Sequence, residues 1–142
     1  MKADRKNATN VFNVLVAETE SNFFSDFKSI ASECCEIFPG IIFNPIRVTD
    51  VNDFNINHLQ KHDLSFIEDE FLLGVSFLLK PQKETDIVLL VNSHIIAEHA
   101  HRIKDVLTEN SLNLTEHISV SNYNFNLKKI VVIDLVKSKL QQ

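Results

Sequence analysis

Glycine and cysteine are both scarce in this chain. Its 142 residues include only Gly40 and Gly74. A phosphate-binding P-loop and a dinucleotide-binding GxGxxG turn both need several closely spaced glycines, so neither way of holding a nucleotide is available. The two cysteines, Cys34 and Cys35, are adjacent. Neighbouring cysteines rarely bridge, so the sequence predicts no disulfide framework and favours a core-filling role for these side chains.

Long apolar runs and basic clusters are also missing. No run approaches the roughly 18 apolar residues of a membrane span, and residues 1–10 lack the apolar core of a secretory signal. The net charge of -5 opposes the phosphate neutralisation that nucleic-acid binding requires. We therefore expect a polar tail over residues 1–10 and one soluble, cytoplasmic domain over residues 11–142. The composition predicts neither membrane insertion nor binding to DNA or RNA.

Apolar runs alternate with helical patterns along the chain. Strand-like runs cover residues 12–17, 41–48, 64–67, 87–91 and 118–120, and Pro45 suits an edge strand. Helical spacing covers residues 21–38 and 94–109, with Ser93 as the expected N-cap of the second helix. Residues 71–80 fit a buried helix or a strand, and for residues 127–140 we favour a helix despite a β-branched run. This alternation predicts βαβ units and a mostly parallel sheet covered on both faces.

Acidic side chains follow two of the expected strands. Glu18 and Glu20 come after the first strand, and Glu68 and Asp69 come after the third. The carboxyl ends of parallel strands line the crevice in which open α/β sheets bind ligands. Two interpretations stay open at this point. The acids are either solvated separately or share a pocket in which they raise one another's pKa.

Four short strings resemble the receiver domain of two-component response regulators. Residues 14–20 (VLVAETE) are similar to the family's first strand and residues 63–68 (DLSFIE) to its third strand. Residues 87–93 resemble the fourth strand, and residues 118–125 resemble the fifth. The resemblance spans roughly residues 11–140. It implies a flavodoxin-like, three-layer α/β/α fold with a five-stranded, mostly parallel sheet in the order 2-1-3-4-5.

The chain departs from this family at its chemical positions. Receivers carry two acidic metal ligands, a phosphoacceptor aspartate, a switch hydroxyl and a lysine. The corresponding positions hold Glu18 with Thr19, then Glu68, Asn92, and Ser121 or Asn122. Phosphoryl transfer needs a divalent cation with several oxygen ligands and a further positive charge. The resemblance therefore implies a degenerate receiver with no phosphorylation cycle, catalytic residue or cofactor, acting as a protein interaction module.

A protein partner, possibly a second copy, is the expected ligand. In receivers the fourth helix, fifth strand and fifth helix commonly form the dimer face. The matching segments here are apolar, so we expect Ile95, Val132 and Leu135 to contribute to an interface. The alternative is that these side chains widen the core of the monomer.

Other functions stay open as alternatives. An unrelated small acidic binding protein, such as an immunity protein or a cytoplasmic assembly subunit of a pilus or secretion system, predicts an antiparallel hairpin joining residues 118–120 to 130–136. A metal-dependent enzyme would use His94, Glu98 and His101, which share a helix face. Without a fourth ligand at a fixed spacing we favour a solvated polar face there, and the same holds for the pair His58 and His62. No serine lies in a GxSxG context, so we expect no enzyme activity.

Overall fold

The computed structural model describes residues 10–55, 59, 61–76, 84–92 and 97–141. The strands of this part are β1 (Asn10–Ala17), β2 (Ile41–Val48), β3 (Leu64–Glu68), β4 (Thr85–Val91) and β5 (Leu112–Ser119). The helices are α2 (Phe23–Glu33), α4 (Asp69–Val75), α5 (Ala97–Glu109) and α6 (Phe125–Leu140). Two short 3-10 turns are η1 (Cys34–Glu36) and η2 (Val51–Asp53).

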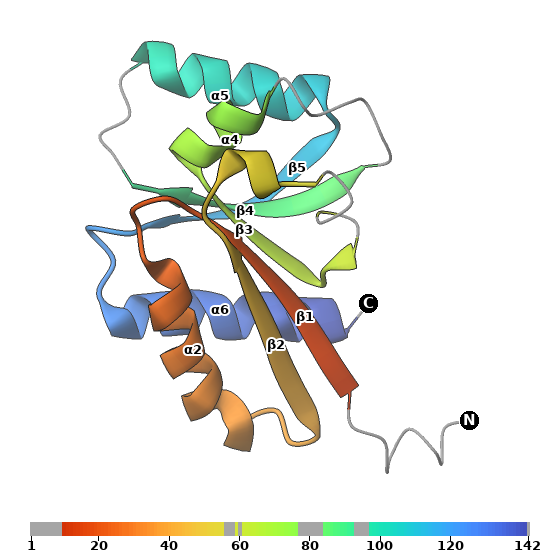
Figure 1. The fold of residues 1–142 in the computed structure, drawn as a ribbon. Coiled ribbons are helices and arrows are strands. Elements are labelled where there is room, and N and C mark those ends of the chain that lie inside the picture. The colour runs from red at the N-terminus through yellow and green to blue at the C-terminus, as the bar shows by residue number, and fades with distance from the viewer. Residues whose placement is uncertain (1–9, 56–58, 60, 77–83, 93–96, 142) are drawn as a thin grey trace.

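All five strands belong to one sheet in the order β2-β1-β3-β4-β5, and every neighbouring pair is parallel. Helices α2 and α6 lie on one side of the sheet, and α4 and α5 lie on the other (Figure 1). This is the three-layer, flavodoxin-like α/β fold that was expected, with the predicted strand order. The hairpin expected for an unrelated small binding protein is not formed, because residues 130–136 lie in α6.

The core has two layers because side chains of a buried strand alternate between the faces of the sheet. On β1, Val14 and Val16 point toward α2 and α6, whereas Leu15 points toward the opposite face. Phenylalanines dominate the first layer, where the ring of Phe66 lies 4.9 Å from that of Phe23 and 5.7 Å from that of Phe27. These contacts fix α2 against the centre of the sheet, directly after the loop that follows β1.

Most predicted elements are confirmed, with shifted ends. The expected helix over residues 21–38 is divided into α2 and η1, and the chain then turns at Gly40, whose positive φ of 85° suits glycine. Residues 71–80 begin within the helix α4 rather than a strand. Asn10, which was assigned to the polar tail, is the first residue of β1. The N-cap predicted at Ser93 lies outside the described residues.

The fifth strand is wrongly bounded in the sequence prediction. It covers Leu112–Ser119 rather than residues 118–120, and most of its first half is exposed. Polar residues on an edge strand weaken the alternating pattern from which strands are predicted, since one side of the strand meets solvent. The C-terminal segment is helical as expected, because Lys128, Val132 and Val136 recur every fourth residue and form one buried stripe.

Both edges of the sheet carry features that discourage pairing with another strand. β2 is an edge strand as predicted, and it contains Pro45, which has no amide hydrogen to donate. On the opposite edge, the register between β4 and β5 shifts next to Thr115, forming a bulge. Bulges and prolines are common protections of exposed edges.

Of the helices that the structure describes, none has the length and apolar character needed to span a membrane.

Candidate functional site at the ends of β1 and β3

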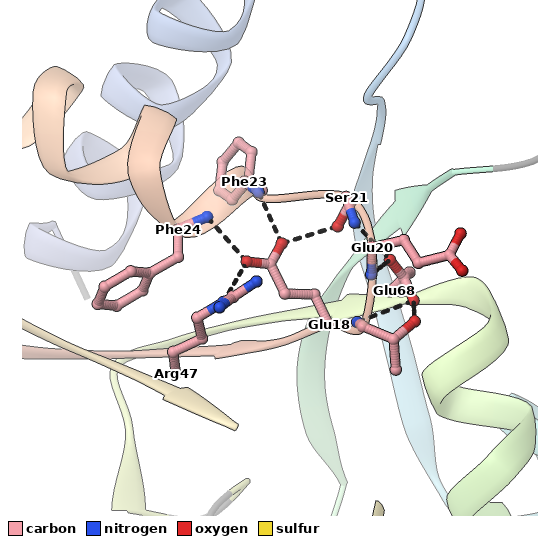
Figure 2. A network of polar contacts seen from close by, with 8 residues as sticks. Glu18, Glu20, Ser21, Phe23, Phe24, Arg47 and Glu68 are labelled. Carbon is pink, nitrogen blue, oxygen red and sulfur yellow. Dashed lines mark hydrogen bonds and ion pairs between the residues drawn. The ribbon is translucent and has the colours of Figure 1, made fainter. Parts of the chain in front are cut away.

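The polar residues after β1 and the last residue of β3 meet at the carboxyl edge of the sheet. Because β2 and β3 lie on opposite sides of β1, the chain reverses its direction of winding between β1 and β3. Such a switch point is where open α/β sheets form ligand-binding crevices. Glu18 and Glu68 both lie here and both are fully buried, with 0% of each residue exposed (Figure 2). The structure therefore brings together the acids that the sequence placed at two strand ends.

Four donors from the loop after β1 surround the Glu68 carboxylate. Oε1 accepts hydrogen bonds from the backbone nitrogen of Thr19 at 3.1 Å and from its hydroxyl at 2.6 Å. Oε2 accepts from the backbone nitrogens of Glu20 at 3.1 Å and Ser21 at 2.9 Å. Two carboxylate oxygens offer about four acceptor positions. These donors therefore use the whole hydrogen-bonding capacity of Glu68.

Glu18 is held in a similar way at the start of α2. Its Oε1 accepts from the hydroxyl of Ser21 at 2.7 Å and from the backbone nitrogen of Phe23 at 2.6 Å. Its Oε2 accepts from the backbone nitrogen of Phe24 at 3.1 Å and from Nε of Arg47 at 2.8 Å. The N-cap residue Asn22 makes no side-chain capping bond. Glu18 thus satisfies the first amides of α2, which have no partner within the helix.

Ser21 joins the two carboxylates. Its backbone nitrogen donates to Glu68 and its hydroxyl donates to Glu18, so this single residue links the two acids through hydrogen bonds (Figure 2). This proximity follows from the sheet order, because the carboxyl ends of the neighbouring parallel strands β1 and β3 lie side by side. Glu20 contributes its backbone nitrogen to the network, whereas the residue is exposed and its side chain points away from both carboxylates.

The idea of separately solvated acids is wrong for Glu18, Glu68 and Asp69, since all three are fully buried, and it holds only for Glu20. The expected mutual rise in pKa is also wrong for Glu68. Burial raises the pKa of this carboxyl, but the bonds from the Thr19 hydroxyl and the amides of residues 19–21 outweigh that effect and hold the pKa below its ordinary value of 4.5. Glu68 is therefore a carboxylate at neutral pH.

The remaining aligned positions do not join this network. Asn92 directly follows β4 and is half-buried, and Ser121 and Asn122 are exposed in the turn after β5. Within the described residues, no hydrogen bond or ion pair connects Asn92 or Ser121 to Glu18 or Glu68. Ser121, at the position aligned with the receiver lysine, is an uncharged and exposed residue.

Of the interface candidates, Val132 is wrong. It is 2% exposed and belongs to the core between α6 and the sheet, and Leu135 is half-buried against the same core. The alternative of a wider buried face is therefore correct for Val132, and the interface role of Leu135 stays a prediction. Ile95 lies outside the described residues.

Metal binding by the histidines finds no support in the part of the chain that the structure describes. That part contains no group of three or more histidine, cysteine, aspartate or glutamate residues arranged to hold a metal ion. His101 is exposed on α5 and lies 3.6 Å from Asp105. His58, His94 and the side chain of Glu98 lie outside the described residues, so the solvated polar faces favoured for these positions stay predictions.

Sequence reasoning missed Arg47 and Ser21. Arg47 is the next-to-last residue of β2, and its charge interrupts an otherwise apolar strand end, which is a signal that an acid lies nearby. Ser21 lies three residues after Glu18, a spacing that lets its hydroxyl reach back to that side chain. A third residue was also missed, since Lys128 is buried on α6 and paired with Asp26 of α2 at 2.8 Å.

Together, the fold and the site define a flavodoxin-like α/β protein with two buried carboxylates at the switch point of its sheet. No family model and no curated protein matches the chain. Among solved structures, the chain is similar to a protein from P. pentosaceus described as an NADPH-quinone reductase. The two share 13% identity with a TM-score of 0.43, over 89% of this chain and 95% of the other. Similarity at this level does not indicate what the chain binds or does.

Proposed function

We propose that this protein is a cytoplasmic, non-catalytic regulatory module of the degenerate-receiver type, which acts by binding a protein partner. The observation that carries the proposal is the saturation of Glu68. It occupies the position aligned with the phosphoacceptor, and four donors already engage its two oxygens. A carboxylate must expose an oxygen to attack a phosphoryl group, and this one is directed into the loop.

Metal-assisted phosphoryl transfer has little support from the neighbouring residues. Mg²⁺ requires nearly octahedral oxygen coordination, usually with one or two carboxylates. Glu18 is committed to Arg47 and to the start of α2, and Thr19 supplies a hydroxyl where an acidic ligand is expected. The aligned lysine position holds exposed Ser121. Neither charge neutralisation nor product binding has a suitable group at the aligned positions.

Intact-mass analysis after incubation with acetyl phosphate and Mg²⁺ tests the absence of phosphorylation. We expect the mass of the wild-type protein to stay unchanged, because the acceptor oxygens are occupied. The variant Glu68→Ala serves as the control, since any label that it also acquires lies at another residue. An acid-labile phosphoryl group on the wild type that is missing from Glu68→Ala contradicts the proposal.

The partner surface that we favour lies on α5, β5 and α6, where apolar side chains reach the exterior. Ile130 of α6 is 55% exposed and Leu114 of β5 is 43% exposed. Leu114 also borders an apolar groove between α5 and β5, lined by Leu89, Ala100, Ile103, Lys104, Leu107 and Leu114. Because a bulge disturbs the edge of β5, we propose contact through side chains rather than through strand pairing.

Self-association through this surface is tested by light scattering over a range of concentrations. We expect a dimer that Ile130→Glu weakens, since a buried charge without a partner is costly. Ile42→Glu is the matched control, because Ile42 is also 55% exposed but lies on β2 at the other edge of the sheet. A wild-type protein that stays monomeric at high concentration, or two variants that behave identically, counts against this surface.

A further inference from the structure

Three consecutive backbone amides and one hydroxyl in the β1–α2 loop converge on a single carboxylate. The amides belong to Thr19, Glu20 and Ser21, and the hydroxyl belongs to Thr19. Amides of successive residues that point into one concavity form a nest, which binds anions through its partial positive charges. The four donors approach both oxygens of Glu68 at distances from 2.6 to 3.1 Å.

This arrangement is separate from the end of helix α2. The amides of Phe23 and Phe24, at the helix start, donate to Glu18, whereas the donors to Glu68 precede the helix. The two anions are also on different elements, since Glu18 follows β1 in the chain and Glu68 ends β3. The loop donors would therefore lose their partner if Glu68 were removed, while the helix would keep its own.

We propose that the β1–α2 loop is an oxyanion cradle that Glu68 occupies as a built-in ligand, and that the emptied cradle binds phosphate. A carboxylate and a phosphate both present oxygens at hydrogen-bonding distance to such donors, so the same four groups can serve either anion. The loop of the native protein is thereby fixed permanently in its anion-bound form. This inference goes beyond the proposed regulatory role and is independent of whether a partner protein binds.

Nearby charges set the expected affinity. Arg47 supplies a positive charge next to the site, but it is paired with Glu18. Glu20 is an exposed acid whose backbone nitrogen contacts Glu68, and Glu70 is an exposed acid two residues after Glu68. Asp69 is buried, and its Oδ1 accepts a bond from the amide of Glu70. These acids repel a phosphate dianion. We therefore expect weak but saturable binding, because like charges nearby oppose the anion.

The decisive variant is Glu68→Ala, which removes the carboxylate and leaves space for an anion. Its matched control is Glu68→Gln, which removes the same charge but keeps the side chain in the cradle. Titration with inorganic phosphate is followed by amide chemical shifts and by melting temperature, against sodium chloride of equal ionic strength. Because phosphate also stabilises proteins in general by being excluded from their surfaces, only the excess over the wild type counts.

We expect saturable phosphate-dependent shifts at the amides of residues 19–21 and an excess rise in melting temperature for Glu68→Ala alone. Adding Thr19→Val removes one hydroxyl donor and should weaken phosphate binding about fivefold. If Glu68→Ala is unfolded in chloride, phosphate should restore its helical circular dichroism. The cradle proposal is overturned if Glu68→Ala neither binds phosphate nor refolds in it. It is also overturned if Glu68→Gln binds phosphate equally well. Phosphorylation of the wild type would instead overturn the proposed function and leave this result unaffected.

Discussion

The hydroxyl of Thr19 donates to Oε1 of Glu68 at 2.6 Å, which ties the residue after β1 to the last residue of β3. Hydrogen bonds to a charged acceptor are shorter and stronger than those between neutral groups. The contact joins side chains at the carboxyl ends of the two strands. In open α/β sheets, ligands bind in the crevice at this end of the strands. Here the protein stabilises its own fold at the place where related architectures bind other molecules.

Replacing Glu68 by glutamine should lower stability in a pH-dependent manner. The amide group of glutamine cannot accept all four bonds, so we expect a loss of about 1–3 kcal/mol in the free energy of unfolding at neutral pH. Because the folded pKa of Glu68 lies below its ordinary value of 4.5, the unfolded chain binds the proton more readily. The stabilisation is thus complete above that value and is lost as pH falls through the folded pKa. Urea unfolding at several pH values should show the two proteins converging in acid.

Glu20→Gln provides the control for this experiment, since Glu20 is exposed and belongs to the same loop. Its stability should differ from that of the wild type by no more than about 0.5 kcal/mol. A loss from Glu68→Gln that stays constant over the whole pH range would show that the charge of Glu68 plays no part.

Arg47→Met tests the ion pair with Glu18. The substitution keeps the aliphatic stem and removes the donor that lies 2.8 Å from Oε2 of Glu18. We expect a loss of about 1–2 kcal/mol, toward the low end for charged hydrogen bonds, because the Arg47 side chain is 35% exposed to screening solvent. Chemical denaturation measures the loss. Arg102→Met on the exposed side of α5 is the control and should be nearly neutral. A double-mutant cycle with Glu18→Gln that gives no coupling would contradict a direct interaction.

The fold was predictable from the sequence largely because its central strands are buried on both sides. β3 is buried at every position, and the last four residues of β1 are buried as well, so both appear in the sequence as continuous apolar runs. The edge strand β5 was poorly bounded because most of its first half faces solvent. The helix α6 was harder to recognise for two reasons. Its own apolar residues are spread around the whole helix rather than along one face, and its β-branched run also suits a strand.

The site was only partly predictable. The positions of Glu18 and Glu68 follow from the rule that parallel strands end at one edge of the sheet. Their state does not follow from it, because the sequence cannot show that the amides of residues 19–21 turn toward Glu68. Arg47 lies on β2, which is neither of the strands that carry the two acids. Its pairing with Glu18 therefore depends on strand order rather than on any local pattern.

Asn124→Ala should destabilise the C-terminal helix. Asn124 is the N-cap of α6, and its side chain accepts a hydrogen bond from the amide of Leu127 at 2.8 Å. Loss of such a cap typically costs about 1 kcal/mol. Asn22→Gly is a contrasting control, because the N-cap of α2 has a positive φ of 52° and makes no side-chain capping bond. Thermal unfolding should show a lower melting temperature for the first variant and an equal or higher one for the second. Equal losses in both would indicate that the side chain of Asn22 stabilises the start of α2 although it makes no capping bond.

The pair formed by Asp26 and Lys128 should show strong coupling, because it joins α2 to α6 and its lysine is buried. The Lys128 side chain is 9% exposed, and its Nζ lies 2.8 Å from Asp26. Asp26→Ala leaves that cation without its partner, so we expect a loss of about 2–3 kcal/mol, less than for a fully buried pair because Asp26 is 35% exposed. The double variant Asp26→Leu with Lys128→Met should recover most of the loss, since it removes both charges and keeps apolar volume.

Glu33→Ala is the matched control for Asp26→Ala. Glu33 pairs with Lys129 between the same helices at 2.8 Å, but both of these side chains are more exposed. Its removal should leave stability nearly unchanged, because solvent screens an exposed ion pair. If Asp26→Ala is as harmless as Glu33→Ala in chemical denaturation, Lys128 finds another partner or reaches solvent.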